Sequence, residues 1–130
     1  MKQSLQQNQY AVFSLEVEKS ETRFTTAKEI IDYLQEQINT HETATFIAIF
    51  DHYAHTQQLP QGQIADEIID AMSIIFCFGI TLPSPDVMAV RPRSIGVTEM
   101  EDKFLITFIE APMPVANITM EEWVKAICNR

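Results

Sequence analysis

Residues Met72–Ile80 read MSIIFCFGI, an uncharged apolar run that is rich in β-branched and aromatic side chains. A buried helix is an open alternative here, because periodicity does not separate helix from strand in a short apolar run. Gly79 and the proline-bearing loop that follows favour a strand that ends near Thr81. We therefore predict an interior strand of a β-sheet.

Four further segments are predicted to form strands of the same sheet. Thr45–Phe50 (TFIAIF) is predicted to be a central strand that is buried on both faces. Tyr10–Val17 (YAVFSLEV) alternates in part and is the first strand, and Phe104–Glu110 (FLITFIE) is the last. Arg91–Thr98 is predicted to be a short edge strand, because Pro92 is tolerated only at an edge or at a strand start.

Two helices are predicted from capping patterns followed by apolar residues at helical spacing. Thr26–Glu29 is a capping box at the start of the first helix, and Thr119–Glu122 repeats the pattern before a C-terminal helix. Residues 56–70 form a loop around Pro60 and Gly62, with a possible short helix over its isoleucines. The predicted buried helix faces consist of Ala27, Ile30, Ile31, Leu34 and Ile38, and of Met120, Trp123, Val124 and Ile127.

The order of these elements is strand, helix, four strands, helix. Strands that follow one another without intervening helices are typical of the α+β class. We predict one domain over residues 1–130, with an antiparallel sheet of about five strands and two main helices on one face. The second face then needs a cover, because the predicted central strands are apolar on both sides. A neighbouring subunit, residues 56–70 or an apolar ligand would serve, and we favour a homodimer.

The sequence carries a large negative charge. Its formal net charge is −9, and no Lys or Arg occurs between Lys28 and Arg91. Nonspecific nucleic-acid binding needs cations that displace counterions from phosphate, and an anionic membrane surface repels an acidic chain. We therefore expect no nucleic-acid partner and no membrane. The acidic surface either keeps the protein in solution or docks a basic partner.

No segment suggests export, a cofactor or a metal. The N-terminal residues MKQSLQQNQY include no apolar core of a signal peptide, and no apolar run approaches the about 20 residues that span a bilayer. Cys77 and Cys128 have no metal-ligand spacing. Glycine-rich phosphate loops and dinucleotide motifs are missing from the sequence. We predict a cytoplasmic protein without a cofactor or a metal.

The stretch FDHYAHT, residues 50–56, concentrates polar side chains at the end of a predicted strand. On a strand, Asp51 and His52 point to opposite faces and cannot form a dyad. His52 and His55 converge only if the chain turns helical after His52, and a metal site there lacks a third ligand. We predict that His52 lines a strand-end pocket together with Tyr53, as a hydrogen-bonding residue or as a general base.

Arg91, Arg93 and Ser94 form a basic cluster in an otherwise acidic chain. The planar guanidinium of arginine suits a carboxylate or a phosphate, so the cluster is a candidate anion site. The alternative is that both arginines pair with Glu99, Glu101 or the acids of another subunit.

Cys77 lies within the apolar run and is either a small buried residue or a nucleophile. A nucleophile requires a neighbour such as His52 that stabilises the thiolate.

The Asp51-His52 and Phe78-Gly79 motifs, in this order of elements, are similar to those of a bacterial domain family of unknown function. Members of that family carry an Asp-His pair at one strand end and a Phe-Gly pair at a later one. The resemblance covers about residues 24–111 and implies a TATA-binding-protein-like β-α-β4-α fold. It implies no reaction.

We predict a small-ligand-binding or accessory protein whose pocket lies where the strand ends Asp51-His52 and Phe78-Gly79 meet. Arg91 or Arg93 would contact a small anionic ligand. One alternative is an enzyme that uses His52, alone or with Cys77. Another is an interaction module that uses the acidic surface or the second sheet face. The predicted binding residues are Asp51, His52, Tyr53, His55, Phe78, Gly79, Arg91, Arg93 and Ser94.

Overall fold

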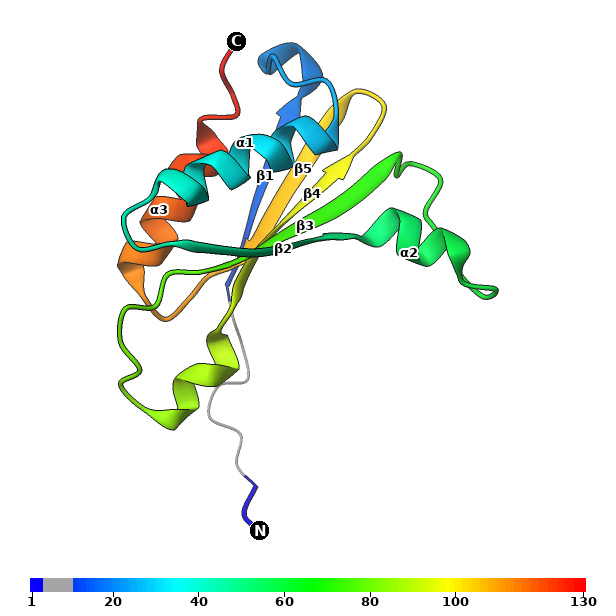
Figure 1. Ribbon diagram of the computed structural model, residues 1–130. Helices are drawn as coiled ribbons and strands as arrows, with labels where there is room; N and C mark the ends of the chain where they lie inside the picture. The colour runs from blue at the N-terminus through cyan, green and yellow to red at the C-terminus, as the bar shows by residue number, and fades with distance from the viewer. Residues whose placement is uncertain (4–10) are drawn as a thin grey trace.

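The sheet has five antiparallel strands in the spatial order β1-β5-β4-β3-β2. The computed structural model in Figure 1 describes residues 1–3 and 11–130. Its strands are β1 (Val12–Glu18), β2 (Thr45–Asp51), β3 (Asp70–Cys77), β4 (Arg93–Glu99) and β5 (Lys103–Ile109). Its helices are α1 (Ala27–Thr40), α2 (His52–Gln58) and α3 (Pro114–Lys125), and two short 3-10 helices span η1 (Lys19–Glu21) and η2 (Pro85–Val90). The predicted α+β class is confirmed, and Tyr10 of the predicted first strand lies outside the described residues.

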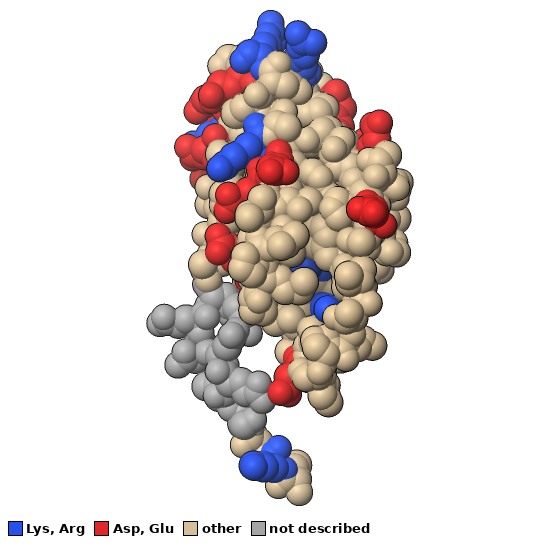
Figure 2. All heavy atoms as spheres, turned by 90° about the vertical axis from the view of Figure 1, so that its left-hand side faces the viewer, with Lys and Arg blue, Asp and Glu red and all other residues tan. Residues whose placement is uncertain are grey.

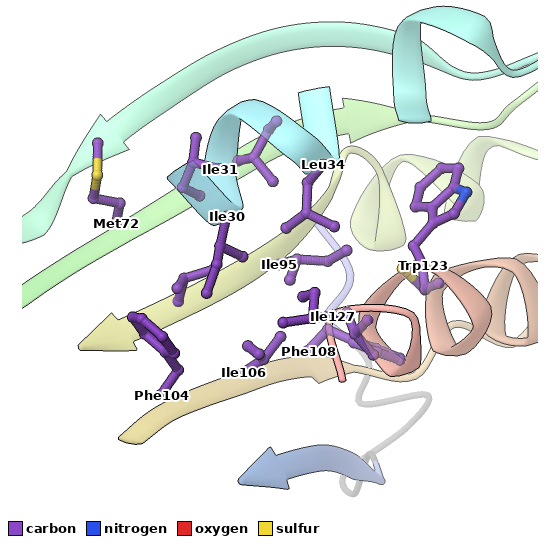
Figure 3. Packing of buried hydrophobic residues seen from close by; sticks show 14 of the residues in the cluster. Ile30, Ile31, Leu34, Met72, Ile95, Phe104, Ile106, Phe108, Trp123 and Ile127 are labelled. Atoms are coloured by element: carbon purple, nitrogen blue, oxygen red, sulfur yellow. The ribbon is translucent and has the colours of Figure 1, made fainter. Parts of the chain in front are cut away.

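The hydrophobic core lies between one face of the sheet and the two long helices. In Figure 1, α1 and α3 cover the same side of the sheet. Alternate residues of β3 point into this core, because side chains alternate along a strand. Figure 3 shows side chains from α1 and from the C-terminal segment meeting those of the strands. Its labelled residues are Ile30, Ile31, Leu34, Met72, Ile95, Phe104, Ile106, Phe108, Trp123 and Ile127.

The helix α1 begins where its capping pattern predicts. Thr26 is the N-cap, and its hydroxyl accepts a hydrogen bond from the backbone N–H of Glu29. In contrast, α3 begins at Pro114, before the predicted capping box, so Thr119 lies inside the helix. Pro114 suits a first helical position because its fixed φ is already helical and its missing N–H needs no partner there.

The predicted positions of two strands in the sheet are wrong. We expected Thr45–Phe50 to be central, but β2 is an edge strand, where Ile47 and Phe50 are 50% and 41% exposed. We expected residues 91–98 to form an edge strand, but β4 is the middle strand. Pro92 permits this because it lies just before β4 and removes no hydrogen bond from the ladder.

The second face of the sheet is only partly apolar. This corrects the assumption that the central strands are apolar on both sides, from which we inferred that the second face needs a cover. Here β3 contributes Ser73, Ile75 and Cys77, all half-buried, and β4 contributes Ser94 and Thr98. In Figure 1, α2 lies on this side of the sheet, beyond the end of β2. We predicted a short helix over the isoleucines of residues 56–70, but the short helix α2 begins directly after β2.

Among the described residues, no helix combines the length and apolar character needed to cross a membrane.

Candidate functional site

The two halves of the predicted pocket lie at opposite ends of the sheet. The strands β2 and β3 are antiparallel, with Asp51 opposite Met72 and Thr45 opposite Cys77. The carboxyl end of β2 therefore lies next to the amino end of β3, far from Phe78 and Gly79. The predicted meeting of these two strand ends is wrong, because antiparallel neighbours place successive carboxyl ends at opposite edges of a sheet.

The residues around His52 attach α2 to the sheet. Asp51 is the N-cap of α2, and its Oδ1 accepts a hydrogen bond from the N–H of Ala54 at 2.9 Å. His52 Nε2 lies 2.9 Å from Ser73 Oγ on the second face. The Phe50 ring contacts both imidazoles, with ring centroids 4.7 Å from His52 and 5.3 Å from His55. The polar side chains of the stretch FDHYAHT therefore have a structural role, because they hold α2 against the sheet.

The chain does turn helical after His52, so both histidines contact the same aromatic ring. Tyr53 is half-buried on the same short helix. Within the described part of the chain, no group of three or more His, Cys, Asp or Glu side chains could hold a metal ion.

His52 cannot stabilise a thiolate at Cys77. His52 is bonded to Ser73, and Cys77 lies four residues further along β3, a distance of about 13 Å in a strand. The thiol instead accepts a hydrogen bond from the N–H of Gly79, with 3.4 Å between nitrogen and sulfur. The His52–Cys77 pair that the sequence suggested is therefore wrong.

An open groove of about 650 Å³ lies at the other end of the sheet. It forms where β3 ends and the chain crosses, through Pro83 and the short helix η2, to the start of β4. Two side chains of this crossing, Ile80 and Leu82, are 77% and 74% exposed. The groove is lined by Ile47, Cys77, Gly79, Ile80, Thr81, Leu82, Met88, Arg91 and Pro92.

Arg91 is the charged residue among those that line the groove. Its Nη1 donates a hydrogen bond to the backbone carbonyl of Thr81 at 2.7 Å. Its guanidinium also lies against the backbone of Gly79, where an added Cβ would be 2.4 Å from Nη1 and 2.6 Å from Cζ. Only glycine lets the guanidinium come this close to the backbone at position 79, because the Cβ of any larger residue would displace it.

Arg93 has a structural role instead of the predicted anion contact. Its Nη1 donates to the carbonyl of Val90 at 3.0 Å, and its Nη2 donates to the carbonyl of Ile109. It lies opposite Phe76 in the sheet and so faces the helices, whereas Ser94 is exposed on the second face. Arg93 thus joins the end of η2 to the end of β5.

Phe78 also belongs to the helix side of the sheet. Its ring stacks on Trp123, with 5.5 Å between centroids, and meets the ring of His41 edge-on. His41 Nδ1 lies 3.1 Å from the backbone nitrogens of Thr43 and Ala44 and accepts a hydrogen bond from each N–H group. Neither the sequence nor the Phe-Gly motif indicated this aromatic cluster.

Of the predicted site residues, the groove brings together Cys77, Gly79 and Arg91. Phe78 and Arg93 line a much smaller cavity of about 10 Å³ together with Gly79 and Arg91. Asp51, His52, Tyr53, His55 and Ser94 line neither the groove nor this cavity. The apolar lining was not predicted from the sequence, although Ile80, Leu82 and Met88 stand in a proline-bearing loop, where large apolar side chains are a signal in themselves.

The surroundings of the groove are poor in charge. Residues 71–90 contain one charged residue, Asp86. Figure 2 shows the helix side of the molecule, with most charged side chains gathered toward the end opposite the N-terminal residues. Arg91 therefore has few charged neighbours in the sequence segments that line the groove, although Arg93 lines a smaller cavity together with it.

Comparison with curated proteins gives no match. The resemblance to a family of unknown function is confirmed in its general form, because a family model does match. The bacterial origin and the two strand-end motifs stay predictions. The chain belongs to the family of unknown function DUF6858, whose model matches residues 1–129.

Proposed function

We propose that this protein binds a small amphipathic molecule in the groove beside Arg91. The observation that carries the proposal is an apolar hollow of about 650 Å³ with one guanidinium among its lining residues. Small-molecule sites typically have this character, with mostly apolar walls and a few polar groups that orient the ligand. The cytoplasmic location and the homodimer stay predictions.

The lining favours binding over catalysis. None of the groove residues is a His, Asp or Glu, the side chains that most often act as general acids and bases. The His52 side chain, which we considered as a general base, bonds to Ser73 of β3. This contact lies near the carboxyl end of β2, at the end of the sheet opposite the groove. Cys77 is the titratable thiol among the lining residues, and it accepts a hydrogen bond from the N–H of Gly79.

The test is a titration with 8-anilinonaphthalene-1-sulfonate, a fluorescent anion with an apolar body. We expect saturable binding at a single site, weakened about tenfold or more by Leu82→Asp, which introduces a repelling charge into the groove wall. Ile118→Asp is the matched control, because Ile118 is exposed on α3 and does not line the groove.

Equal weakening by both substitutions, or the absence of saturable binding, would contradict the proposed site. Circular dichroism of each variant shows that the fold persists, as expected for substitutions at exposed positions.

A further inference from the structure

We propose that the groove selects aliphatic monocarboxylates, and that Gly79 determines this selectivity by positioning Arg91. The inference rests on the proposed binding function and adds the chemical class of the ligand. The apolar tail would lie along Ile47, Leu82 and Met88, and the carboxylate would meet the guanidinium.

The first argument is the orientation of the guanidinium. Arg91 Nη1 is engaged by the Thr81 carbonyl at 2.7 Å. This bond leaves the edge formed by Nε and Nη2, two parallel N–H groups that match the two oxygens of a carboxylate. A lysine carries the same charge but is a point donor and cannot reproduce this paired geometry.

The second argument is charge. One guanidinium balances the single negative charge of a carboxylate, whereas a phosphate monoester carries about −1.5 to −2 at neutral pH. The chain has a net charge of −9, which disfavours an unbalanced additional charge. The apolar walls also disfavour a second ionic group further along the ligand, because it would lose water without gaining a partner.

The third argument is the contact with Gly79. A Cβ at this position would come within 2.4 Å of Nη1, so Gly79→Ala must displace the guanidinium from its present position. Two of the apolar wall residues, Ile47 on β2 and Met88 on η2, stand on elements other than the segment that contains Gly79. Gly79 is therefore a positioning residue that acts mainly on the charged end of the ligand.

The experiment is calorimetric titration of the full chain with decanoate, decanol and decyl phosphate. For the unaltered protein we expect decanoate to bind about tenfold or more tightly than decanol, because the charge-assisted pair adds to the same apolar contact. Decyl phosphate should bind more weakly than decanoate.

The variants Arg91→Gln, Arg91→Lys and Gly79→Ala identify the groups responsible. Arg91→Gln should remove the preference for decanoate over decanol, and Arg91→Lys and Gly79→Ala should reduce it, with the loss of affinity falling mainly on decanoate. Arg23→Gln is the control, because Arg23 is exposed and does not line the groove. A merely structural role for Gly79 would weaken both ligands equally and would overturn its positioning role.

The outcomes for the two proposals are distinct. If decanoate and decanol bind equally, or if decyl phosphate binds most tightly, the carboxylate class is wrong and the binding function stands. If none of the three compounds binds, and 8-anilinonaphthalene-1-sulfonate also fails to bind, both proposals are overturned.

Discussion

Arg91 and Arg93 are two residues apart, yet their guanidinium groups serve different parts of the structure. Arg93 donates to the carbonyls of Val90 and Ile109 and joins two chain segments. Arg91 precedes β4 and reaches across Gly79 to the groove. Both side chains line a small cavity of about 10 Å³, but Arg93 is bonded to two backbone carbonyls, and of the two arginines only Arg91 also lines the larger groove.

Asp70 is expected to make the folded state less stable at neutral pH. Burial raises the pKa of this carboxyl group, the negative charges of Asp51 and Glu99 raise it further, and a hydrogen bond from the N–H of Ala71 opposes the shift. With a higher pKa in the folded state, the folded protein binds more protons than the unfolded chain in the acid range. Stability therefore falls as the pH rises through that range, which lies just above the ordinary Asp pKa of about 3.9.

Asp70→Asn should consequently raise the melting temperature at neutral pH, and the gain should shrink as the pH approaches 4. Asparagine retains an oxygen that can accept from the Ala71 N–H. Melting curves over this pH range, with Asp66→Asn at an exposed position as the control, measure the effect. A lower melting temperature for Asp70→Asn at neutral pH would show that the carboxylate stabilises the fold.

At the scale of the elements, Glu99 connects the middle strand to the first helix. Its side chain is buried, with Oε1 accepting from the N–H of Ala27 at 3.0 Å and Oε2 accepting from Lys19 Nζ at 2.9 Å. A carboxylate at this position satisfies a free N–H at the start of α1 and lies favourably in the field of the helix dipole. One side chain thereby fixes α1 and η1 against β4.

Glu99→Gln should lower the free energy of unfolding by about 1–3 kcal/mol, because it removes a charge-assisted bond and places an amide N–H₂ group beside Lys19. Urea denaturation measures this loss. Glu101→Gln is a suitable comparison, since Glu101 is exposed in the turn between β4 and β5. An unchanged unfolding midpoint for Glu99→Gln would mean that the helix start is held by other contacts.

At the scale of the whole molecule, the second face of the sheet leaves apolar side chains exposed without the cover that α1 and α3 give the first. Val12 and Ile109 lie opposite each other on β1 and β5 and are 64% and 51% exposed. The next pair along the same face of these two strands consists of small polar residues, Ser14 and Thr107. This surface is where the predicted homodimer would form, by contact between identical faces related by a two-fold axis.

Ile109→Glu should therefore convert a dimer into a monomer, because two copies would bring the two new carboxylates close together across the two-fold axis. Light scattering after size-exclusion chromatography measures the mass, and Ile118→Glu on α3 is the control. A monomeric unaltered protein, or a dimer that persists in Ile109→Glu, would refute this interface.

Local patterns were sufficient for most elements of the fold. The capping of α1 by Thr26 and the apolar spacing behind it act over a few residues, and the β-branched and aromatic composition that predicted β3 and β5 is likewise a property of each short segment. These features are readable from a single sequence because their energetics are local. The α+β class follows from their order, and α3 was recognised although its first residue was misplaced.

The order of strands in the sheet and the contents of the groove depend on contacts between distant parts of the chain. An apolar segment such as β2 is compatible with a central or an edge position, and only its single pairing with β3 places it at the edge. The antiparallel pairing then separates Asp51-His52 from Gly79, and the crossing from β3 to β4 brings Arg91 back to Gly79. The sequence supplies the reactive groups, but pairing between strands determines which of them meet.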